Sequence, residues 1–317
     1  MNFVKVIAVL VMTATVLSSC QQSGSTTVGH GYKVGTWKTA QTIQPFFYEQ
    51  FADGQTVEVV PFTNPGDQKT ALLAGSLDMT GTTMATAIVG AAAGEPIVVV
   101  AGLCNKCSAL VVGKDSGIYS ERDLRGKTIA YVPGTMHHIL LLDVLRRHDI
   151  DPDNDVTLVR VDFFDMGLAL ANGDIDAFLS GEPYPSVAEH EGYGRILSFP
   201  YFDEGVGAIN AAMITTRDMV ENEPERVQAL VDMHIASTRY LLETPDAWLE
   251  TASAFGTDMD VLNISAENIE LFYDIDEAFI AQTERLAQEM HLMGVIPHVP
   301  DVAALFDLRF IKAGHAR

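Results

Sequence analysis

The sequence predicts an α/β fold of two similar lobes with a cleft between them, and three observations support this prediction. From Tyr32 onward, short apolar runs alternate with stretches of helical periodicity, a spacing typical of βαβ units and a mostly parallel sheet. A helix–Gly–strand unit, ALLAGSLDMTG at residues 71–81, occurs again as ALANGDIDAFL at residues 169–179. After Thr216 the pattern changes to helices, so we expect two crossings between the lobes. Loops at the carboxyl ends of the strands then face the cleft.

The first half of the chain reads as strands separated by helices. Asn64 opens the second helix, and Gly75 ends it in the C′ position, where a positive φ is needed. Thr82 is the expected N-cap of the third helix. The predicted strands are YKVGTW (32–37), QTVEVVPF (55–62), SLDMT (76–80) and the fully buried run IVVVAGL (97–103), and the predicted helices are IQPFFYEQFA (43–52), QKTALLA (68–74) and TMATAIVGAAAG (83–94).

The second half repeats this alternation before the helical tail. Gly173 ends a helix as Gly75 does, and Asp78 and Asp176 stand where the buried strand of each repeated unit starts. The predicted strands are KTIAYV (127–132), VTLVRV (156–161), IDAFL (175–179), RILSF (195–199) and AINAAMITT (208–216). The predicted helices are MHHILLLDVLRRH (136–148), residues 166–172 and 185–191, and three in the tail at residues 224–243, 245–255 and 277–290.

The N-terminus reads as an export signal. Lys5 precedes an apolar run too short for a spanning helix, and the run ends in Leu17-Ser18-Ser19-Cys20, which resembles a bacterial lipobox. The alternative is an ordinary secretory signal with a cysteine that plays no part. We expect residues 1–19 to be a signal peptide, Cys20 to carry lipid, and residues 20–31 to be a flexible linker. The protein would then be a lipoprotein in the periplasm or at the cell surface, and the anchoring membrane stays open.

Composition and charge exclude some partners. The chain that follows residue 31 is long enough for two lobes of ordinary size, and 48% of the 317 residues of the full sequence are hydrophobic. The net charge of −22 argues against nucleic acid or an anionic membrane face as a partner. We find no G-x-S-x-G, H-E-x-x-H or P-loop motif in the sequence.

Several motifs, taken in order, resemble one protein family. They are the lipobox, KVGTW, QKTALLAGSLD, GKTIA, ALANGDIDAF and GEPYP. In this order they resemble the substrate-binding proteins of ABC importers for nitrate, sulfonates, taurine and pyrimidine vitamin precursors, the NitT/TauT group, over residues 32–293. The resemblance implies the two-lobed periplasmic-binding-protein fold of type II. It places the first part of lobe 1 at 32–107, lobe 2 at 108–210, and the return to lobe 1 with C-terminal helices at 211–317.

The resemblance also implies a function without catalysis. The protein would capture a small ligand and deliver it to an ABC permease and its ATPase, as a monomer without a bound metal or cofactor. The loops that follow the strands would form the pocket. The implied ligand-binding residues are Trp37, Lys38, Gln41, Thr82, Thr83, Cys107, Thr135, His137, His138, Phe164, Asp165, Glu182 and Tyr184.

Several of these residues have a structural alternative. Trp37 either covers an apolar or cationic part of the ligand or packs against its own lobe. Thr82 and Thr83 either begin an anion-binding helix N-terminus or act as a plain N-cap. Glu182 either accepts hydrogen bonds from the ligand or forms a salt bridge across the hinge.

The turn PGTMHH is a second helix start. Thr135 is the expected N-cap, and one of His137 and His138 should face the cleft while the other is exposed. We expect the histidine in the cleft to be neutral, because the positive end of the helix dipole disfavours imidazolium.

Cys104 and Cys107 form a C-x-x-C pair with three interpretations. They form a disulfide, they stay free thiols with one lining the pocket, or they hold a soft metal with His137 or His138, with Glu182 as a further candidate ligand.

The charge of the pocket loops bears on the ligand. Lys38 is the only cation in these loops, which disfavours a phosphate-like ligand. A zwitterion or a polar aromatic compound held by Trp37, Phe163, Phe164 and Tyr184 fits better, within a range that runs from taurine-like sulfonates to pyrimidines. Two other functions stay open. One is an iron-dependent pyrimidine-precursor synthase, and the other is a metal-binding or sensory protein that uses the cysteines and histidines.

Overall fold

The computed structural model describes residues 31–201 and 206–315. The segment Gly31–Arg317 forms one compact unit. The predicted signal peptide, the lipidation site Cys20 and almost all of the linker lie outside the described residues. Among the described residues, no helix is both long enough and apolar enough to cross a membrane.

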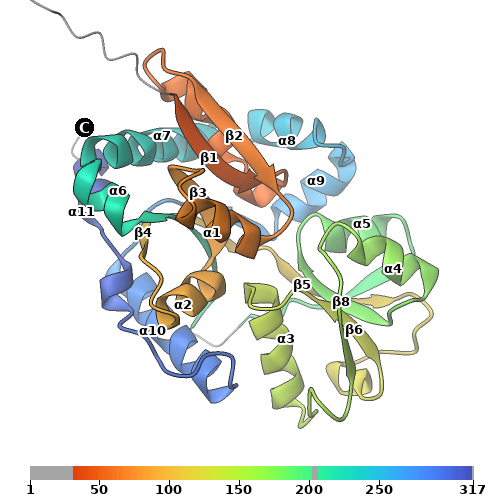
Figure 1. Cartoon of the computed structure of the whole chain (residues 1–317). Coiled ribbons are helices and arrows are strands. Elements are labelled where there is room, and N and C mark those ends of the chain that lie inside the picture. The colour runs from red at the N-terminus through yellow and green to blue at the C-terminus, as the bar shows by residue number, and fades with distance from the viewer. Residues whose placement is uncertain (1–30, 202–205, 316–317) are drawn as a thin grey trace, which may run out of the picture. The chain divides into compact units, whose positions relative to one another are not determined.

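Among the described residues, the first sheet has six strands: β1 (Tyr32–Trp37), β2 (Val57–Phe62), β3 (Met79–Thr83), β4 (Ile97–Lys106), β10 (Ile209–Thr216) and β11 (Ile269–Leu271). Their order is β11-β4-β10-β3-β1-β2. Figure 1 labels β1, β2, β3 and β4 of this sheet. β1 is parallel to β2 and β3, but β10 is antiparallel to β3 and β4, and β11 is antiparallel to β4. Of these six strands, β1 to β4 run in one direction and β10 and β11 run against them, so the predicted mostly parallel sheet is confirmed, with antiparallel pairs where β10 returns between β3 and β4.

The second sheet, in the part of the chain that the structure describes, has five strands: β5 (Ser108–Gly113), β6 (Thr128–Tyr131), β7 (Thr157–Arg160), β8 (Ala177–Gly181) and β9 (Gly194–Ser198). Their order is β7-β6-β8-β5-β9. β6 is parallel to β7 and β8, whereas β5 is antiparallel to β8 and β9. This sheet is mixed as well. All of its strands come from one continuous stretch of chain.

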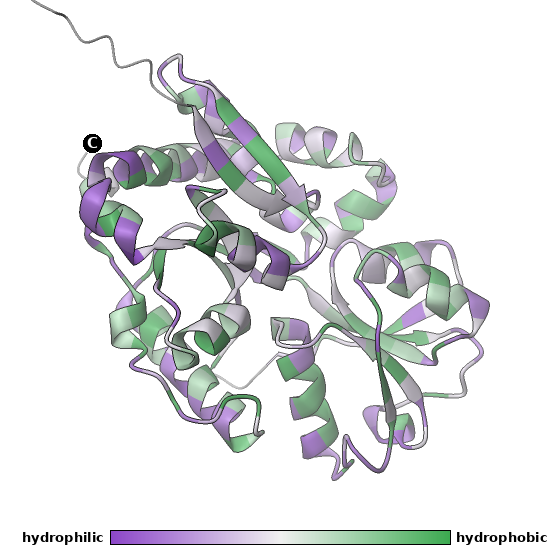
Figure 2. Cartoon of the chain, in the orientation of Figure 1, coloured by the Kyte–Doolittle hydropathy of each residue, from purple (hydrophilic) through white to green (hydrophobic). Residues whose placement is uncertain are grey.

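Helices pack against both sheets. α3 (Met136–Arg147), α4 (Met166–Asn172) and α5 (Tyr184–His190) belong to the second sheet. In Figure 2, α3 carries both hydrophobic and hydrophilic residues, as expected of a helix that covers a sheet. The remaining α-helices are α1 (Pro65–Leu73), α2 (Met84–Ala92), α6 (Arg217–Asn222), α7 (Pro224–Glu243), α8 (Pro245–Ser253), α9 (Met259–Ala266), α10 (Glu277–Leu292) and α11 (Arg309–His315).

The predicted amphipathic helix at 43–52 has a different geometry. It is a 3-10 helix, Gln44–Phe51, and a shorter 3-10 helix, Ala40–Thr42, precedes it. Its buried residues, Gln44 with Phe47 and Pro45 with Tyr48, repeat every third position, which matches the three-residue turn of a 3-10 helix.

The repeated unit has the same local structure in both copies. Gly75 and Gly173 have φ of +72° and +78°, and the hydrogen bonds at both helix ends follow the Schellman pattern. The carboxylate of Asp78 accepts the N–H of Lys33 at 2.7 Å, and that of Asp176 accepts the N–H of Thr128 at 2.8 Å. Each aspartate therefore ties the start of its strand to the neighbouring parallel strand.

The two sheets, each with its helices, form two lobes, which we call lobe 1 (first sheet) and lobe 2 (second sheet). β4 ends at Lys106 and β5 begins at Ser108, so the first crossing is at Cys107. The second crossing lies between β9 and β10. We propose 32–107, 108–210 and 211–317 as the lobe boundaries, because each change of sheet falls close to these positions.

Candidate ligand site between the two lobes

A pocket of about 450 Å³, including the space at its open mouth, lies between the two lobes. Lobe 1, the 3-10 segment that follows β1, and lobe 2 all contribute to its wall. The lining residues are Trp37, Thr39, Gln41, Thr42, Pro65, Thr83, Cys104, His137, Phe163, Phe164, Ser180, Gly181, Tyr184, Asn210 and Ala211.

Trp37 ends β1 and lines the pocket from lobe 1. Its side chain is buried, and its ring also lies against the backbone of Gly81, so it both packs against its own lobe and forms part of the wall. The turn that follows is held by its own hydrogen bonds. The hydroxyls of Thr39 and Thr42 lie 2.9 Å apart, and Thr42 also donates to the carbonyl of Trp37.

Thr83, not Thr82, is the N-cap of α2. Its hydroxyl accepts the N–H of Thr86 at 3.2 Å, and Thr83 lines the pocket. Thr82 is a fully buried residue of β3 outside the pocket lining. The predicted cap was therefore one residue too early, because β3 continues to Thr83.

Gly181 allows two side chains to meet at the end of β8. A Cβ atom at this position would lie 2.8 Å from Nε2 of Gln41 and 3.2 Å from Nε2 of His137. Gln41 comes from lobe 1, and His137 comes from α3 of lobe 2. The missing side chain of Gly181 is therefore what allows Gln41 to reach the wall of lobe 2.

The two adjacent histidines point to different places. His137 lines the pocket, its Nδ1 lies 3.1 Å from the hydroxyl of Ser108, and its ring meets that of Phe163 edge-on. His138 lies outside the pocket lining, accepts the N–H of Gly134, and packs on Tyr131. Burial lowers the pKa of both His137 and His138 to about 4, so both are neutral at pH 7. The expected neutrality thus has burial, and not the helix dipole, as its cause, and His138 is half-buried where exposure was expected.

Three aromatic side chains form the wall of lobe 2. Phe163 is buried, while Phe164 is partly exposed and packs edge-on against Tyr184 with ring centroids 5.4 Å apart. Burial also raises the pKa of the Tyr184 phenol, which therefore stays protonated. Together with Trp37 across the pocket, these rings offer flat apolar surfaces to a ligand.

Two polar atoms in the wall have no partner within the described residues. Oε1 of Gln41 and Oγ of Ser180 are both buried and unpaired, and their residues come from opposite lobes. Buried polar groups are nearly always hydrogen-bonded, so two unpaired atoms in one wall are unusual. Among the residues that the structure describes, the lining contains no Lys, Arg, Asp or Glu, and Lys38 is an exposed residue outside it.

Glu182 lies at the hinge behind the pocket wall. Its side chain is 1% exposed, and its carboxylate accepts the N–H of Ser186 at 3.2 Å and Nδ2 of Asn268 at 3.4 Å. Burial raises the pKa of Glu182 to about 7. No ion pair of Glu182 exists within the described parts of the chain, so the alternative of a salt bridge across the hinge is not formed.

Cys104 and Cys107 are free, buried thiols, so the disulfide that we considered is not formed in this structure. Cys104 lines the pocket and Cys107 lies behind it. Across residues 31–201 and 206–315, no group of three His, Cys, Asp or Glu side chains is placed to hold a metal ion.

Two further predicted residues lie outside the lining. Thr135 caps α3 as expected, by accepting the N–H of His138, and its hydroxyl donates to the carbonyl of Val132. Asp165 is the residue before α4 and lies outside the lining.

Sequence reasoning missed Ser180, Gly181 and Asn210. The first two end β8, so the rule that ligands bind at the carboxyl ends of strands could have found them. Asn210 had no such signal. Ile209 pairs with Asn105 and Ala211 with Cys104, so Asn210 is an extra, bulged residue of β10. A bulge of this kind changes the direction in which a side chain points, and no local sequence pattern predicts it.

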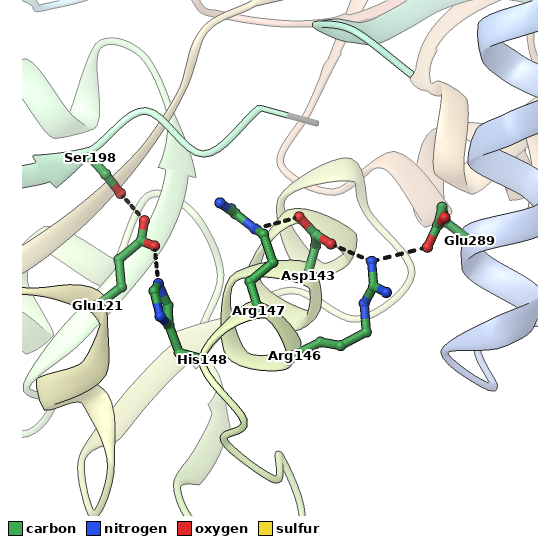
Figure 3. A network of polar contacts seen from close by, with 7 residues as sticks. All are labelled: Glu121, Asp143, Arg146, Arg147, His148, Ser198 and Glu289. Carbon is green, nitrogen blue, oxygen red and sulfur yellow. Dashed lines mark hydrogen bonds and ion pairs between the residues drawn. The ribbon is translucent and has the colours of Figure 1, made fainter. Parts of the chain in front are cut away.

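Several contacts among the described residues join the lobes. Besides the approach of Gln41 to Gly181, the hydroxyl of Thr86 donates to the carbonyl of Gly134 at 3.1 Å. Near the C-terminal end of α3, the guanidinium of Arg146 pairs with Glu289 on α10 at 3.1 Å (Figure 3). The same guanidinium is held by Asp143, which is buried in α3.

Comparison with known proteins adds a family and a fold. A family model described as NMT1/THI5 like matches residues 47–248, which is more than half of the chain. The 4-amino-5-hydroxymethyl-2-methylpyrimidine phosphate synthase of Schizosaccharomyces pombe is 30% identical over 131 residues, 41% of this chain and 36% of the synthase. A protein of Escherichia coli described as an aliphatic sulfonates-binding protein is 25% identical over 198 residues, 62% of each chain. The chain thus spans less than two thirds of either relative.

Among solved structures, the alkanesulfonate-binding protein SsuA from Xanthomonas axonopodis pv. citri, bound to MOPS, is similar with a TM-score of 0.79. It is 21% identical, and the match covers 88% of this chain and 98% of SsuA. This likeness confirms the predicted two-lobed periplasmic-binding-protein fold. The match of the family model over residues 47–248 shows more: the chain belongs to the NMT1/THI5-like family.

Proposed function

We propose that the protein is the solute-binding component of an ABC importer and that its ligand is a small, neutral, hydrogen-bonding aromatic compound. The observation that carries this proposal is the pocket itself. It lies between two lobes, it is lined by aromatic rings and uncharged polar groups, and each lobe contributes one unpaired polar atom.

The absence of charge in the lining decides between ligand classes. Moving an ion from water into a site without a counter-charge costs several kcal/mol. The described lining has no such counter-charge, and His137 is neutral. Nitrate, sulfonates, taurine and zwitterions are therefore disfavoured relative to a neutral heteroaromatic ring.

The polar atoms indicate which groups this ring carries. Oε1 of Gln41 accepts a hydrogen bond, so the ligand presents an N–H or O–H group to lobe 1. Oγ of Ser180 and the side chain of Asn210 offer partners for a second polar group. A ligand that bonds both Gln41 and Ser180 stabilises the closed arrangement, because the two residues belong to different lobes.

Delivery completes the proposed role. The closed, loaded protein docks on an ABC permease whose ATPase drives uptake. We also propose that lipid on Cys20 holds the protein at the periplasmic or outer face of a membrane, as the lipobox indicates. The expected monomeric state is part of the same proposal.

The synthase-like alternative does not fit the described site. An iron site needs several converging ligands, but His137 and His138 point to different places. Among the described residues, no third His, Cys, Asp or Glu joins either of them. The same observation argues against a metal-binding sensory role, so we propose neither function.

A thermal-shift screen of the purified full chain tests the proposal. We expect neutral pyrimidines or flavin-type rings to raise the melting temperature, and we expect nitrate, taurine and alkanesulfonates to leave it unchanged. Native mass spectrometry of protein purified without denaturant would identify a ligand that is retained. Stabilisation by the anions alone would refute the neutral ligand, and no stabilisation by any compound would refute the capture role.

A matched pair of serine variants connects the result to the pocket. Ser180→Ala removes an unpaired buried hydroxyl in the wall, whereas Ser237→Ala removes one within α7, away from the pocket. We expect only Ser180→Ala to weaken binding of the stabilising compound, by about tenfold for one lost hydrogen bond. Equal effects of the two variants would contradict the proposed contact.

A further inference from the structure

The two cysteines lie where the chain leaves lobe 1. Cys104 is in β4, Cys107 is the single residue between β4 and β5, and each is 1% exposed. No other cysteine occurs in the described parts of the chain. The pair therefore occupies the hinge on which lobe movement depends.

An unusual backbone conformation lies between the two cysteines and the start of β5. Lys106 and Cys107 have φ of +58° and +67°, a region that non-glycine residues rarely adopt. Such a conformation persists only where its surroundings enforce it. Here the N–H of Lys106 bonds the carbonyl of Ala208 at 2.8 Å, and that of Cys107 bonds the carbonyl of Asn268 at 2.7 Å. Cys104 lies two residues before this bend, and its side chain is close enough to that of Cys107 to help raise the pKa of the Cys107 thiol.

The pair is also connected to the pocket. Cys104 is part of the wall, and the amide of Asn210, another wall residue, donates to the sulfur of Cys107 at 3.2 Å. The same amide also contacts Ser108, whose hydroxyl lies next to the pocket histidine His137. A chemical change at the sulfur of Cys107 therefore alters the hydrogen bonds of polar groups in the pocket wall.

We propose that Cys104 and Cys107 are a redox modification site, which forms a reversible disulfide across the hinge when the lobes open. The oxidant is a small-molecule or protein disulfide of the kind present outside the cytoplasm. One cysteine thiolate attacks the oxidant and forms a mixed disulfide, releasing one thiol. The second thiolate then displaces the other thiol. The pair loses two protons and two electrons, and the oxidant is reduced to two thiols.

Lobe opening controls the rate of this reaction. Both sulfurs are buried, and burial together with the neighbouring Cys104 raises the pKa of Cys107, so little reactive thiolate exists in the closed arrangement. Because a disulfide needs the sulfurs at about 2 Å, the bond also fixes the torsions of Asn105 and Lys106. The oxidised hinge is therefore stiffer than the reduced one.

A redox titration of the full chain tests the proposal. The protein is equilibrated with mixtures of reduced and oxidised glutathione, quenched with an alkylating agent in denaturant, and mapped by peptide mass spectrometry, which separates any product of Cys20. We expect a Cys104–Cys107 bridge that increases with oxidised glutathione and is lost with dithiothreitol. Alkylation of both cysteines at every ratio, or glutathione adducts alone, would overturn the proposal.

A second measurement tests the control by lobe opening. The double variant Thr86→Val with Glu289→Gln removes two contacts between the lobes without touching either cysteine. We expect it to form the bridge several-fold faster than the unmodified chain, and an equal or slower rate would overturn the role of opening. The redox titration measures only the oxidation state of Cys104 and Cys107, so its outcome does not depend on the identity of the proposed ligand.

Discussion

Glu182 shows how strongly one residue can depend on its surroundings. It follows β8 directly, as the sequence indicates, but its carboxyl group is buried at the hinge and does not line the pocket. The sequence predicts that Glu182 lies near the site, because the carboxyl ends of the strands face the cleft. The direction of a side chain depends on packing between lobes, which a local pattern does not contain. The same limit explains why Lys38 and His138 point away from the pocket although their neighbours Trp37 and His137 line it.

The raised pKa of Glu182 predicts a pH-dependent difference between the wild type and Glu182→Gln. The pKa is about 7 in the folded state and 4.5 in an unperturbed chain, so the folded state binds the proton more tightly. This carboxyl group therefore lowers the free energy of unfolding as pH rises from about 4.5 to 7, by on the order of 3 kcal/mol in total. We expect the free energy of unfolding of Glu182→Gln to be close to that of the wild type at pH 5 and clearly higher than that of the wild type at pH 8.

Urea unfolding of both proteins from pH 5 to 8 measures this difference. Buried histidines have the opposite effect, because their pKa is lowered to about 4 in the folded state. Their titration therefore lowers the free energy of unfolding as the pH falls. Since both proteins contain these histidines, subtraction removes their contribution. A difference between the two proteins that stays constant with pH would contradict the buried, raised carboxyl group.

At the scale of elements, the sequence predicts positions better than pairing. Most strands and helices lie where hydrophobic period and helix caps place them, and both repeat glycines end their helices as expected. The mostly parallel direction of β1 to β4 was predicted, but the antiparallel return of β10 between β3 and β4 was not, because this pairing depends on chain connections far away in sequence. The 3-10 helix Gln44–Phe51 and the cap at Thr83 differ from prediction for smaller reasons, a three-residue period and a shift by one residue.

Two kinds of glycine should respond differently to alanine. Gly75 and Gly173 have positive φ and open space around the missing side chain, so Gly→Ala there costs about 1 kcal/mol of stability through backbone strain. Gly181 has no positive φ, but an added Cβ would lie 2.8 Å from Gln41. We expect the first two variants to melt earlier with unchanged ligand affinity.

Gly181→Ala should show the reverse pattern. It is expected to lose at least about tenfold in affinity for the compound found by the thermal-shift screen, because it displaces the Gln41 contact between the lobes. Calorimetric titration and thermal melting of the three variants separate the two effects. A Gly181→Ala protein that binds as tightly as the wild type would remove Gln41 from the proposed site.

For the whole molecule, the ion pair of Arg146 with Glu289 predicts an effect on closure. Exposed pairs contribute about 0.2–1 kcal/mol and weaken in salt. We expect Glu289→Gln to lower ligand affinity by up to about fivefold in low salt, because the pair joins the lobes, and to have little effect in high salt.

A second polar contact in Figure 3 supplies the control. Glu121 bonds His148 at 2.7 Å and Ser198 at 2.6 Å, all within lobe 2. Glu121→Gln should therefore leave ligand affinity unchanged at either salt concentration. If Glu121→Gln and Glu289→Gln weakened binding equally, the lobe-closing role of Glu289 would be refuted.

The position of β10 sets the order in which the molecule can be assembled during synthesis. This strand lies between β3 and β4 and pairs with both, so lobe 1 lacks a central strand until residues 209–216 have been made. Lobe 2 needs only one uninterrupted stretch that is complete earlier, at Ser198. In a growing or translocating chain, the sheet of lobe 2 can therefore be completed first. The sheet of lobe 1 is completed only after β10 has been made or translocated.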